Sequence, residues 1–134
     1  MSIHVLDASA MVAYLTAESG GPAVRSLLLD PSTVCFAHSV NLCEVYYEFI
    51  RTKGEPNAKA AISSLFADGV IERRDMSRRF WQKVGNLKAR GRISIADCFA
   101  ITLAQELSGE VVTADHHEFD SLVPLAIVPI NFIR

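Results

Sequence analysis

The feature that most constrains the fold is a regular alternation of short apolar segments rich in β-branched residues with longer segments of helical spacing. Strands are predicted over 2–7, 33–37, 70–73 and 110–113, with a last one from 126–128 and 130–133. Helices are predicted over 8–18, 22–30, 39 to about 51, 58–67, 77–90 and 95–107. Such alternation favours a parallel sheet with helices on both faces. We therefore expect an α/β protein, a three-layer α/β/α sandwich with a mostly parallel central sheet.

Three serine or asparagine side chains are predicted to cap helices in this scheme: Ser39, Asn57 and Ser94. The apolar stripe of helix 77–90 is expected to reach the core, and it consists of Phe80, Trp81, Val84 and Leu87.

Length and composition indicate one domain over residues 1–134. Half of the residues are hydrophobic and 21% are charged, which is enough for a real core and too apolar for a disordered chain. No apolar run is long enough to cross a membrane, and the first residues lack the pattern of a signal peptide. Three cysteines with no CxxC spacing fit neither a disulfide framework nor a zinc site, so a cytoplasmic location is expected.

Basic residues concentrate in one part of the chain. The formal net charge is only −2, yet eight of the 13 basic residues lie between Arg73 and Arg92, with Asp75 as the one acid among them. That segment carries +7, and the remainder carries −9. One interpretation is a solvated helical face. The other is an electrostatic surface for nucleic acid, with Arg78, Arg79 and Lys83 as the candidate contacts.

Four acidic residues occupy unusual places in the predicted pattern. Asp7 ends the first strand, and Asp115 follows the strand that precedes the last one. Asp97 lies in the first turn of a late helix, and Glu44 lies within a largely apolar stretch of an earlier helix. Because burying a lone carboxylate is costly, each of them needs a partner or an ion.

Each acid also has an ordinary explanation. Asp7 can cap the helix that follows it, Asp97 can form a capping box with Ser94, and Asp115 can be a turn residue at a strand end. Glu44 can belong to a solvated stripe of its helix. These explanations account for the residues singly and leave their common arrangement unexplained.

The carboxyl ends of parallel strands share one edge of a sheet, and the capped helices begin near that edge. Carboxylates that converge there repel one another unless a cation neutralises them. An all-oxygen ligand set suits Mg²⁺ or Mn²⁺, and such an ion can activate water for phosphodiester hydrolysis. We therefore expect Asp7, Glu44, Asp97 and Asp115 to form a catalytic metal site.

The same residues resemble a known family. The segments 5–10 (Val-Leu-Asp-Ala-Ser-Ala), 93–97 (Ile-Ser-Ile-Ala-Asp) and 112–115 (Val-Thr-Ala-Asp), together with Glu44, are similar to the motifs of PIN-domain ribonucleases. Size and order are closest to VapC-type toxins of type II toxin–antitoxin pairs. The resemblance implies an α/β/α sandwich, Mg²⁺- or Mn²⁺-dependent cleavage of RNA, a homodimer, and silencing by a VapB-type antitoxin.

Carried over by position, the resemblance makes Asp7 and Asp97 the principal metal ligands. It makes Asp115 a further carboxylate and Glu44 a ligand or a base that orients water. Ser9 matches a position where the family often has a hydroxyl near the metal. Relatives often carry a further acid after the last motif, and here either Glu118 or Asp120, or neither, fills that place.

Two alternatives remain open at this point. A related metal-dependent nuclease could act on DNA or structured nucleic acid, and a non-catalytic module could bind RNA or protein on the same scaffold. The early helices also carry more large apolar side chains than one core face needs, which suits a dimer or an antitoxin groove. These residues are Tyr14, Leu15, Tyr46, Tyr47, Phe49 and Ile50.

Overall fold

The computed structural model describes residues 1–125 and 127–134, except for the side chains of Glu118, Val123 and Pro124. Its centre is a five-stranded sheet in the order β3-β2-β1-β4-β5, and every strand pair is parallel. The strands are β1 (Ser2–Leu6), β2 (Thr33–His38), β3 (Ile71–Arg73), β4 (Glu110–Thr113) and β5 (Ile130–Phe132). This arrangement confirms the predicted α/β class and parallel sheet.

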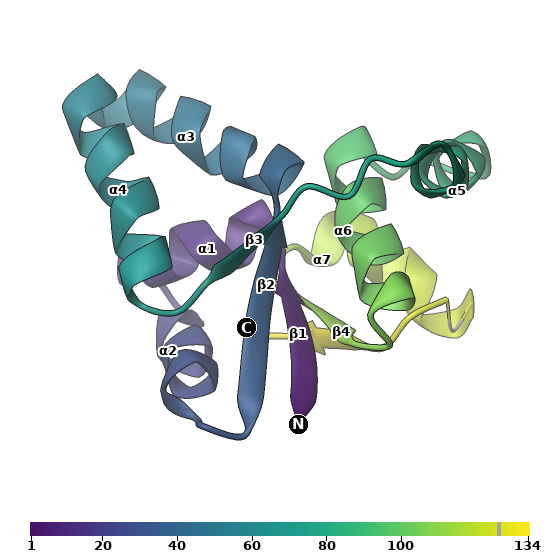
Figure 1. The fold of residues 1–134 in the computed structure, drawn as a ribbon, viewed down its shortest axis with the longest axis horizontal. Helices are drawn as coiled ribbons and strands as arrows, with labels where there is room; N and C mark the ends of the chain where they lie inside the picture. Colours follow the sequence, from purple (N-terminus) through teal and green to yellow (C-terminus); the bar gives the residue numbers. More distant parts are fainter. Residues whose placement is uncertain (126) are drawn as a thin grey trace.

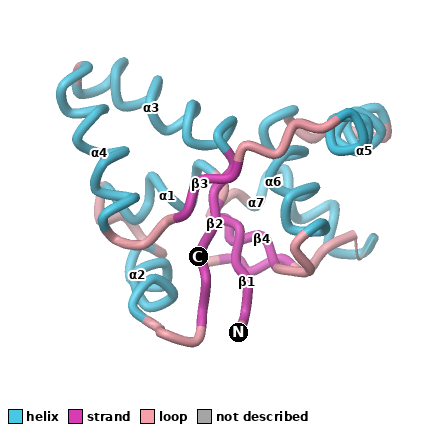
Figure 2. Tube along the Cα trace, in the orientation of Figure 1, coloured by secondary structure: helices cyan, strands magenta, loops and turns pink. Residues whose placement is uncertain are grey.

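Helices cover both faces of the sheet, as Figures 1 and 2 show. On one side lie α1 (Ala8–Leu15), α2 (Gly21–Leu29), α3 (Ser39–Lys53) and α4 (Glu55–Ala67). On the other side lie α5 (Arg78–Ala89) and α6 (Ile95–Glu106). A short helix α7 (His116–Phe119) and the 3-10 helix η1 (Asp120–Leu125) precede β5. The three-layer sandwich is therefore confirmed.

Alternation of side chains along the central strands builds two separate cores. Val5 and Val111 point to the α5–α6 side, where they join Phe99, Ile101 and Leu103 of α6. Their neighbours Leu6 and Val112 point to the other side and pack with α1, α3 and α4. β1 and β4 each carry two consecutive buried apolar residues, Val5-Leu6 and Val111-Val112, as expected where a central parallel strand is covered on both faces.

The carboxyl edge of the sheet gathers several chain segments. Leu6 pairs with Val112 in the β1–β4 register, and the amide of Asp7 donates to the Val112 carbonyl at 3.1 Å. Helix α3 starts directly after β2, at the same edge. Helix α6 precedes β4 and packs against β1 and α3, so its first turn also lies at this edge.

Two of the three predicted caps are wrong. The cap of α3 is His38, whose Nδ1 accepts from the Val40 amide at 3.1 Å, because Ser39 instead donates to Glu72 at 2.7 Å. Helix α4 begins at Glu55, so Asn57 lies inside it. The cap by Ser94 is confirmed.

Other differences follow from local packing. Helix α1 ends at Leu15, three residues earlier than predicted, and Ala17 adopts a positive φ of 54°. Trp81 is 48% exposed rather than buried, since α5 packs on α6 through Phe80, Val84 and Leu87. The segment between the two last predicted strands contains α7 and η1, and the last strand is confined to Ile130–Phe132. Residue 126, once assigned to that strand, lies outside the described residues.

Within the described residues, no helix is both long and apolar enough to cross a bilayer. All three cysteines are free thiols, as their spacing predicted.

Candidate functional site

Asp7 is an acidic side chain at the carboxyl edge that several hydrogen bonds hold in place. It is 1% exposed and caps α1. Its Oδ1 accepts hydrogen bonds from the Ser9 hydroxyl at 2.7 Å and from the Ala10 amide at 2.9 Å. Its Oδ2 accepts one from the Thr113 hydroxyl at 2.5 Å. The carboxylate is thus fixed by its own helix and by the end of β4.

Burial raises the pKa of Asp7 from 3.8 to about 6. The hydrogen bonds from Thr113, Ala10 and Ser9 act in the opposite direction, and the charge of Asp115 adds to the rise. At neutral pH the group is still ionised, so a negative charge sits where water is almost excluded. A cation at this place would offset the cost of that burial.

The two hydroxyls beside Asp7 are themselves held by backbone amides. Thr113 Oγ1 accepts from the Asp115 amide at 2.9 Å, and Ser9 Oγ accepts from the Ala114 amide at 2.9 Å. Each hydroxyl has a single proton, and both protons point to Asp7. Asp7 Oδ1 therefore has both acceptor positions filled, whereas Oδ2 keeps one for a further donor or a cation.

Asp115 stands beside Asp7, directly after β4. Its side chain is half-buried, and its Oδ1 accepts from the His117 amide at 2.9 Å. The strand register brings the two acids together, and the electrostatic influence of Asp115 on Asp7 reflects that proximity. The Thr113 hydroxyl contacts both the Asp7 carboxylate and the Asp115 amide, so the two strand-end acids lie at the same edge of the sheet.

Glu44 and Asp97 are the two candidate acids that lie on helices. Glu44 is half-buried on α3, and its Oε1 lies 3.5 Å from Nδ2 of Asn41, one turn earlier. The same nitrogen donates to the Ala96 carbonyl at 3.2 Å, in the first turn of α6. Asp97 follows Ala96, is 8% exposed, and donates its amide to Ser94 Oγ at 3.2 Å. The amide of Asn41 thus links the neighbourhoods of Glu44 and Asp97.

The donor chemistry of these residues fits a hard divalent cation. The four acids and the two hydroxyls offer only oxygen, and Asp7 is buried with an acceptor position to spare. No three His, Cys, Asp or Glu side chains in the described part of the chain stand close enough together to form a ready-made ion cage.

Sequence comparison assigns the family. The model of the PIN domain matches residues 4–123, which is most of the chain. The chain belongs to the PIN-domain family. A search of curated proteins finds no significant match.

Solved structures agree with this PIN fold. The VapBC2 complex of Rickettsia felis bound to a promoter DNA fragment matches with a TM-score of 0.75 and 15% identity, covering 97% of this chain and 98% of that one. DNA-bound VapBC from Salmonella typhimurium matches with a TM-score of 0.74 and 15% identity, covering 100% of both chains. Mycobacterium tuberculosis VapC20, a toxin that cleaves the sarcin–ricin loop, matches with a TM-score of 0.71 and 18% identity, covering 90% of this chain and 95% of that one. At these identities the likeness establishes the fold.

The possible fifth acid of this PIN domain has another contact. Asp120 is exposed, and its Oδ1 lies 2.8 Å from Nδ1 of His116. The His116 ring also stacks on Phe132 at 4.2 Å between centroids and contacts the Arg134 carbonyl. Hydrogen bonds to Arg134 and Asp120 raise the pKa of His116. The alternative fifth acid, Glu118, has a side chain outside the described residues.

The basic segment maps mainly to α5 and its flanking loops. Arg78 and Arg79 are exposed at the start of the helix, whereas Lys83 pairs with Glu106 of α6 at 2.5 Å. Arg73 binds Asp75 through two nitrogens, each at 2.9 Å. The segment therefore contains both neutralised and solvent-facing charges.

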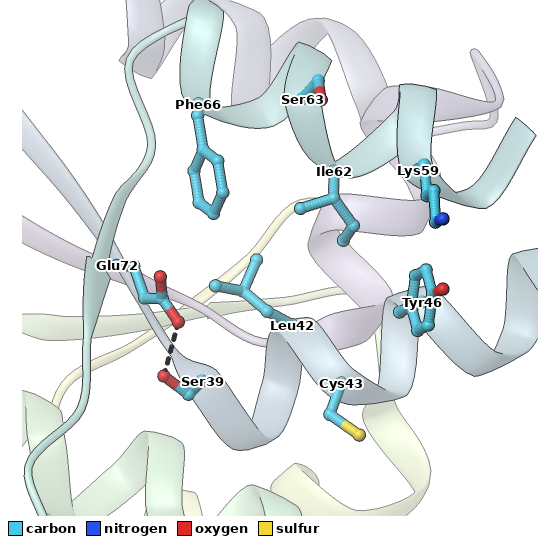
Figure 3. A pocket seen from close by; sticks show the side chains of 9 residues that line it. All are labelled: Ser39, Leu42, Cys43, Tyr46, Lys59, Ile62, Ser63, Phe66 and Glu72. Atoms are coloured by element: carbon cyan, nitrogen blue, oxygen red, sulfur yellow. Dashed lines mark hydrogen bonds between the residues drawn. The ribbon is translucent and has the colours of Figure 1, made fainter. Parts of the chain in front are cut away.

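A groove of about 560 Å³ lies between α3 and α4 (Figure 3). Leu42, Tyr46, Ile62 and Phe66 line it with apolar surface, while Lys59 and Glu72 stand at its margins. Among the apolar residues predicted to form a partner surface, Tyr47 and Ile50 are exposed. Phe49 is 7% exposed and belongs to the core.

Two residues of the site escaped the sequence-based prediction. Thr113 lies within a segment that resembled the family motif, and a hydroxyl at the end of a buried strand is a usable signal. Asn41 lies three residues before Glu44 on α3, and an amide among the core positions Leu42 and Val45 is the corresponding signal. Neither residue could be given a hydrogen-bond partner without the fold.

Proposed function

We propose that this PIN domain is a Mg²⁺- or Mn²⁺-dependent endoribonuclease and the toxin of a toxin–antitoxin pair. The observation that carries the proposal is the ionised, buried carboxylate of Asp7, fixed by three hydrogen bonds beside Asp115 at the carboxyl edge of the sheet. A folded chain retains such a costly group where a cation or a reaction uses it.

In this proposal Asp7 and Asp97 are the principal metal ligands, and Asp115 and Glu44 complete the acidic set. When bound, the ion supplies Lewis acidity that activates water and stabilises charge on the phosphodiester. Ser9 and Thr113 keep Asp7 oriented and ionised. Glu44 orients the attacking water or takes its proton, a role that suits a carboxylate on a separate helix.

The basic segment serves the substrate in the same proposal. The exposed guanidinium groups of Arg78 and Arg79 attract phosphates toward an otherwise acidic molecule, and Lys83 adds to this field. These basic groups partly compensate the negative charge of the phosphate backbone before the backbone approaches the acidic edge of the sheet.

For partners, we propose a VapB-type antitoxin and a homodimer. Two of the structural neighbours are VapBC complexes, and this chain offers an apolar groove between α3 and α4 with a lysine and a glutamate at its margins. An amphipathic antitoxin segment with charges of both signs complements that lining. The cytoplasm is the proposed place of action, because both RNA and such a partner are found there.

Cleavage of total cellular RNA by the purified protein tests the nuclease proposal. We expect fragments with Mg²⁺ or Mn²⁺ and none with a chelator, and mapping of product ends should give defined sites. Glu44→Gln should lose cleavage, whereas Glu48→Gln, on the exposed face of the same helix, should keep it.

Three results would count against the proposal. Cleavage of DNA in preference to RNA would favour the related nuclease. RNA binding without cleavage under any divalent cation would favour a non-catalytic module. Equal activity of Glu44→Gln and Glu48→Gln would remove Glu44 from the site.

A further inference from the structure

Asn41 is completely buried between α3 and α6. A buried asparagine in a helix interior is unfavourable both for helix formation and for desolvation, unless its amide is well used. Its neighbours on the helix, Leu42 and Val45, are core residues, so an apolar side chain would be the ordinary choice at this position. The amide therefore calls for an explanation beyond packing.

The orientation of the amide is fixed by what surrounds it. Nδ2 lies 3.2 Å from the Ala96 carbonyl and 3.5 Å from Glu44 Oε1, and both of these atoms can only accept. A reversed amide would direct its oxygen at two other oxygens. The two Nδ2 protons are thus divided between the first turn of α6 and the carboxylate of Glu44.

The amide oxygen faces the other way. Oδ1 of Asn41 is buried and has no hydrogen-bond partner among the described residues. A leucine at position 41 would avoid the cost of burying an unpaired oxygen. The advantage of asparagine at this position must therefore come from its amide nitrogen.

We infer that Asn41 is a positioning residue of the acidic site, which sets Glu44 of α3 at a fixed place relative to Asp97 of α6. Its Nδ2 donates to the carbonyl of Ala96, one residue before Asp97, and attracts the carboxylate of Glu44, one turn later on α3. Two helices that meet only through packing could slide by fractions of an ångström. A shared donor couples the two acids directly.

This inference rests on the proposed function, in which Glu44 and Asp97 serve one divalent cation. Residues that orient ligands in this way typically change cation affinity by about ten- to hundred-fold when they are removed. The positioning role predicts a loss of that size, and a purely structural role predicts a loss of stability without a change in affinity.

The test uses Asn41→Leu and Asn41→Asp, which both remove the amide nitrogen and keep the same number of side-chain heavy atoms in the same branched arrangement. Mn²⁺ binding is measured by titration calorimetry, and unfolding by urea is measured without the cation. We expect both variants to fold and to bind Mn²⁺ about tenfold more weakly or worse. Thr102→Val is the matched control, because its hydroxyl is also buried and has no hydrogen-bond partner among the described residues, but lies five residues after Asp97 on α6. It should bind Mn²⁺ like the unchanged protein.

A second comparison separates positioning from stability. In a Glu44→Ala background, Asn41→Leu should cause no further loss of Mn²⁺ affinity, because the carboxylate that it orients is gone. Unchanged Mn²⁺ affinity in folded Asn41→Leu and Asn41→Asp would overturn the inference and leave the metal proposal standing. Additive losses in the Glu44→Ala background would also overturn it. Absence of Mn²⁺ binding by the unchanged protein would overturn both.

Discussion

The acidic edge of the sheet and the basic helix α5 are built in opposite ways. At the edge, Asp7 receives three hydrogen bonds and is almost fully buried. On α5, Arg78 and Arg79 extend into solvent, and Lys83 is engaged by Glu106. One region is fixed before any ligand arrives, and the other keeps conformational freedom.

In the proposed nuclease, this difference matches two kinds of task. Catalysis around a cation needs ligands held within fractions of an ångström, and hydrogen-bonded strand ends provide that precision. Attraction of a flexible polyanion needs charge in about the right place, and solvent-exposed arginines provide it without a fixed geometry. The two regions should therefore respond very differently to substitution.

Asp7→Asn should have the largest effect. The substitution keeps the shape of the side chain but removes its charge. The new amide nitrogen must also face a group that, in the unchanged protein, donates a hydrogen bond to the Asp7 carboxylate. We expect RNA cleavage to fall by more than about a hundredfold, beyond the loss typical of residues that only support metal ligands. Initial rates with Mn²⁺ measure this, and cleavage within tenfold of the unchanged protein would exclude Asp7 as a principal ligand.

The raised pKa of Asp7 gives a second prediction, on stability in the absence of divalent cations. Between pH 4 and 6 the folded protein holds a proton on Asp7 that the unfolded chain has released. The free energy of unfolding should therefore decrease as the pH rises from 4 to 6 and then level off. The shift from 3.8 to about 6 corresponds to about 3 kcal/mol.

Urea unfolding from pH 4 to 7 measures this dependence. Asp7→Asn should remove the decrease, so its stability relative to the unchanged protein should improve toward pH 7. Asp30→Asn is the control, because hydrogen bonds from Ser32 lower the pKa of Asp30, the opposite direction to the shift of Asp7. Parallel pH profiles for Asp7→Asn and the unchanged protein would show that Asp7 is not the buried, perturbed group.

The strand-end acids could be predicted from sequence because two simple regularities place them. Asp7 and Asp115 follow apolar runs, and parallel strands bring such positions to one edge. Their ordinary roles are real as well: Asp7 caps α1, Ser94 caps α6, and Asp115 accepts the amide of His117. The capping interpretation of Asp7 and the turn interpretation of Asp115 are therefore confirmed, and both are compatible with a shared site.

The features that could not be predicted from the sequence depend on contacts between distant segments of the chain. The pairing of Lys83 with Glu106 joins two helices whose relative rotation is set by core packing. Ser39 lost its predicted capping role because β3 brings Glu72 within reach of its hydroxyl. The partner of Asn41 is a backbone carbonyl 55 residues away. In each case a local pattern was overridden by a tertiary interaction.

Thr113→Val tests how much the acidic edge depends on its hydrogen bonds. Valine keeps the shape of the side chain, but Asp7 Oδ2 and the Asp115 amide lose their partner. We expect cleavage to fall by about tenfold or more, with Thr113→Ser close to normal because it keeps the hydroxyl. Cleavage rates with Mn²⁺ for the two variants measure this. Equal rates for valine and serine would mean that Asp7 is held well enough by Ser9 and Ala10.

The basic helix should show the smallest and most graded effect. Arg78→Glu with Arg79→Glu should weaken binding of single-stranded RNA and reduce the slope of log affinity against log salt by about 1.4, if each arginine neutralises one phosphate. Lys83→Gln should change the slope less, because Glu106 already engages that ammonium group. Glu106→Gln is the matched variant, since it frees Lys83 and should strengthen RNA binding slightly. Fluorescence anisotropy at several salt concentrations measures all four proteins. A larger change for Lys83→Gln than for the double arginine variant would place the RNA contact on the α6 side of α5 and reverse the expected order.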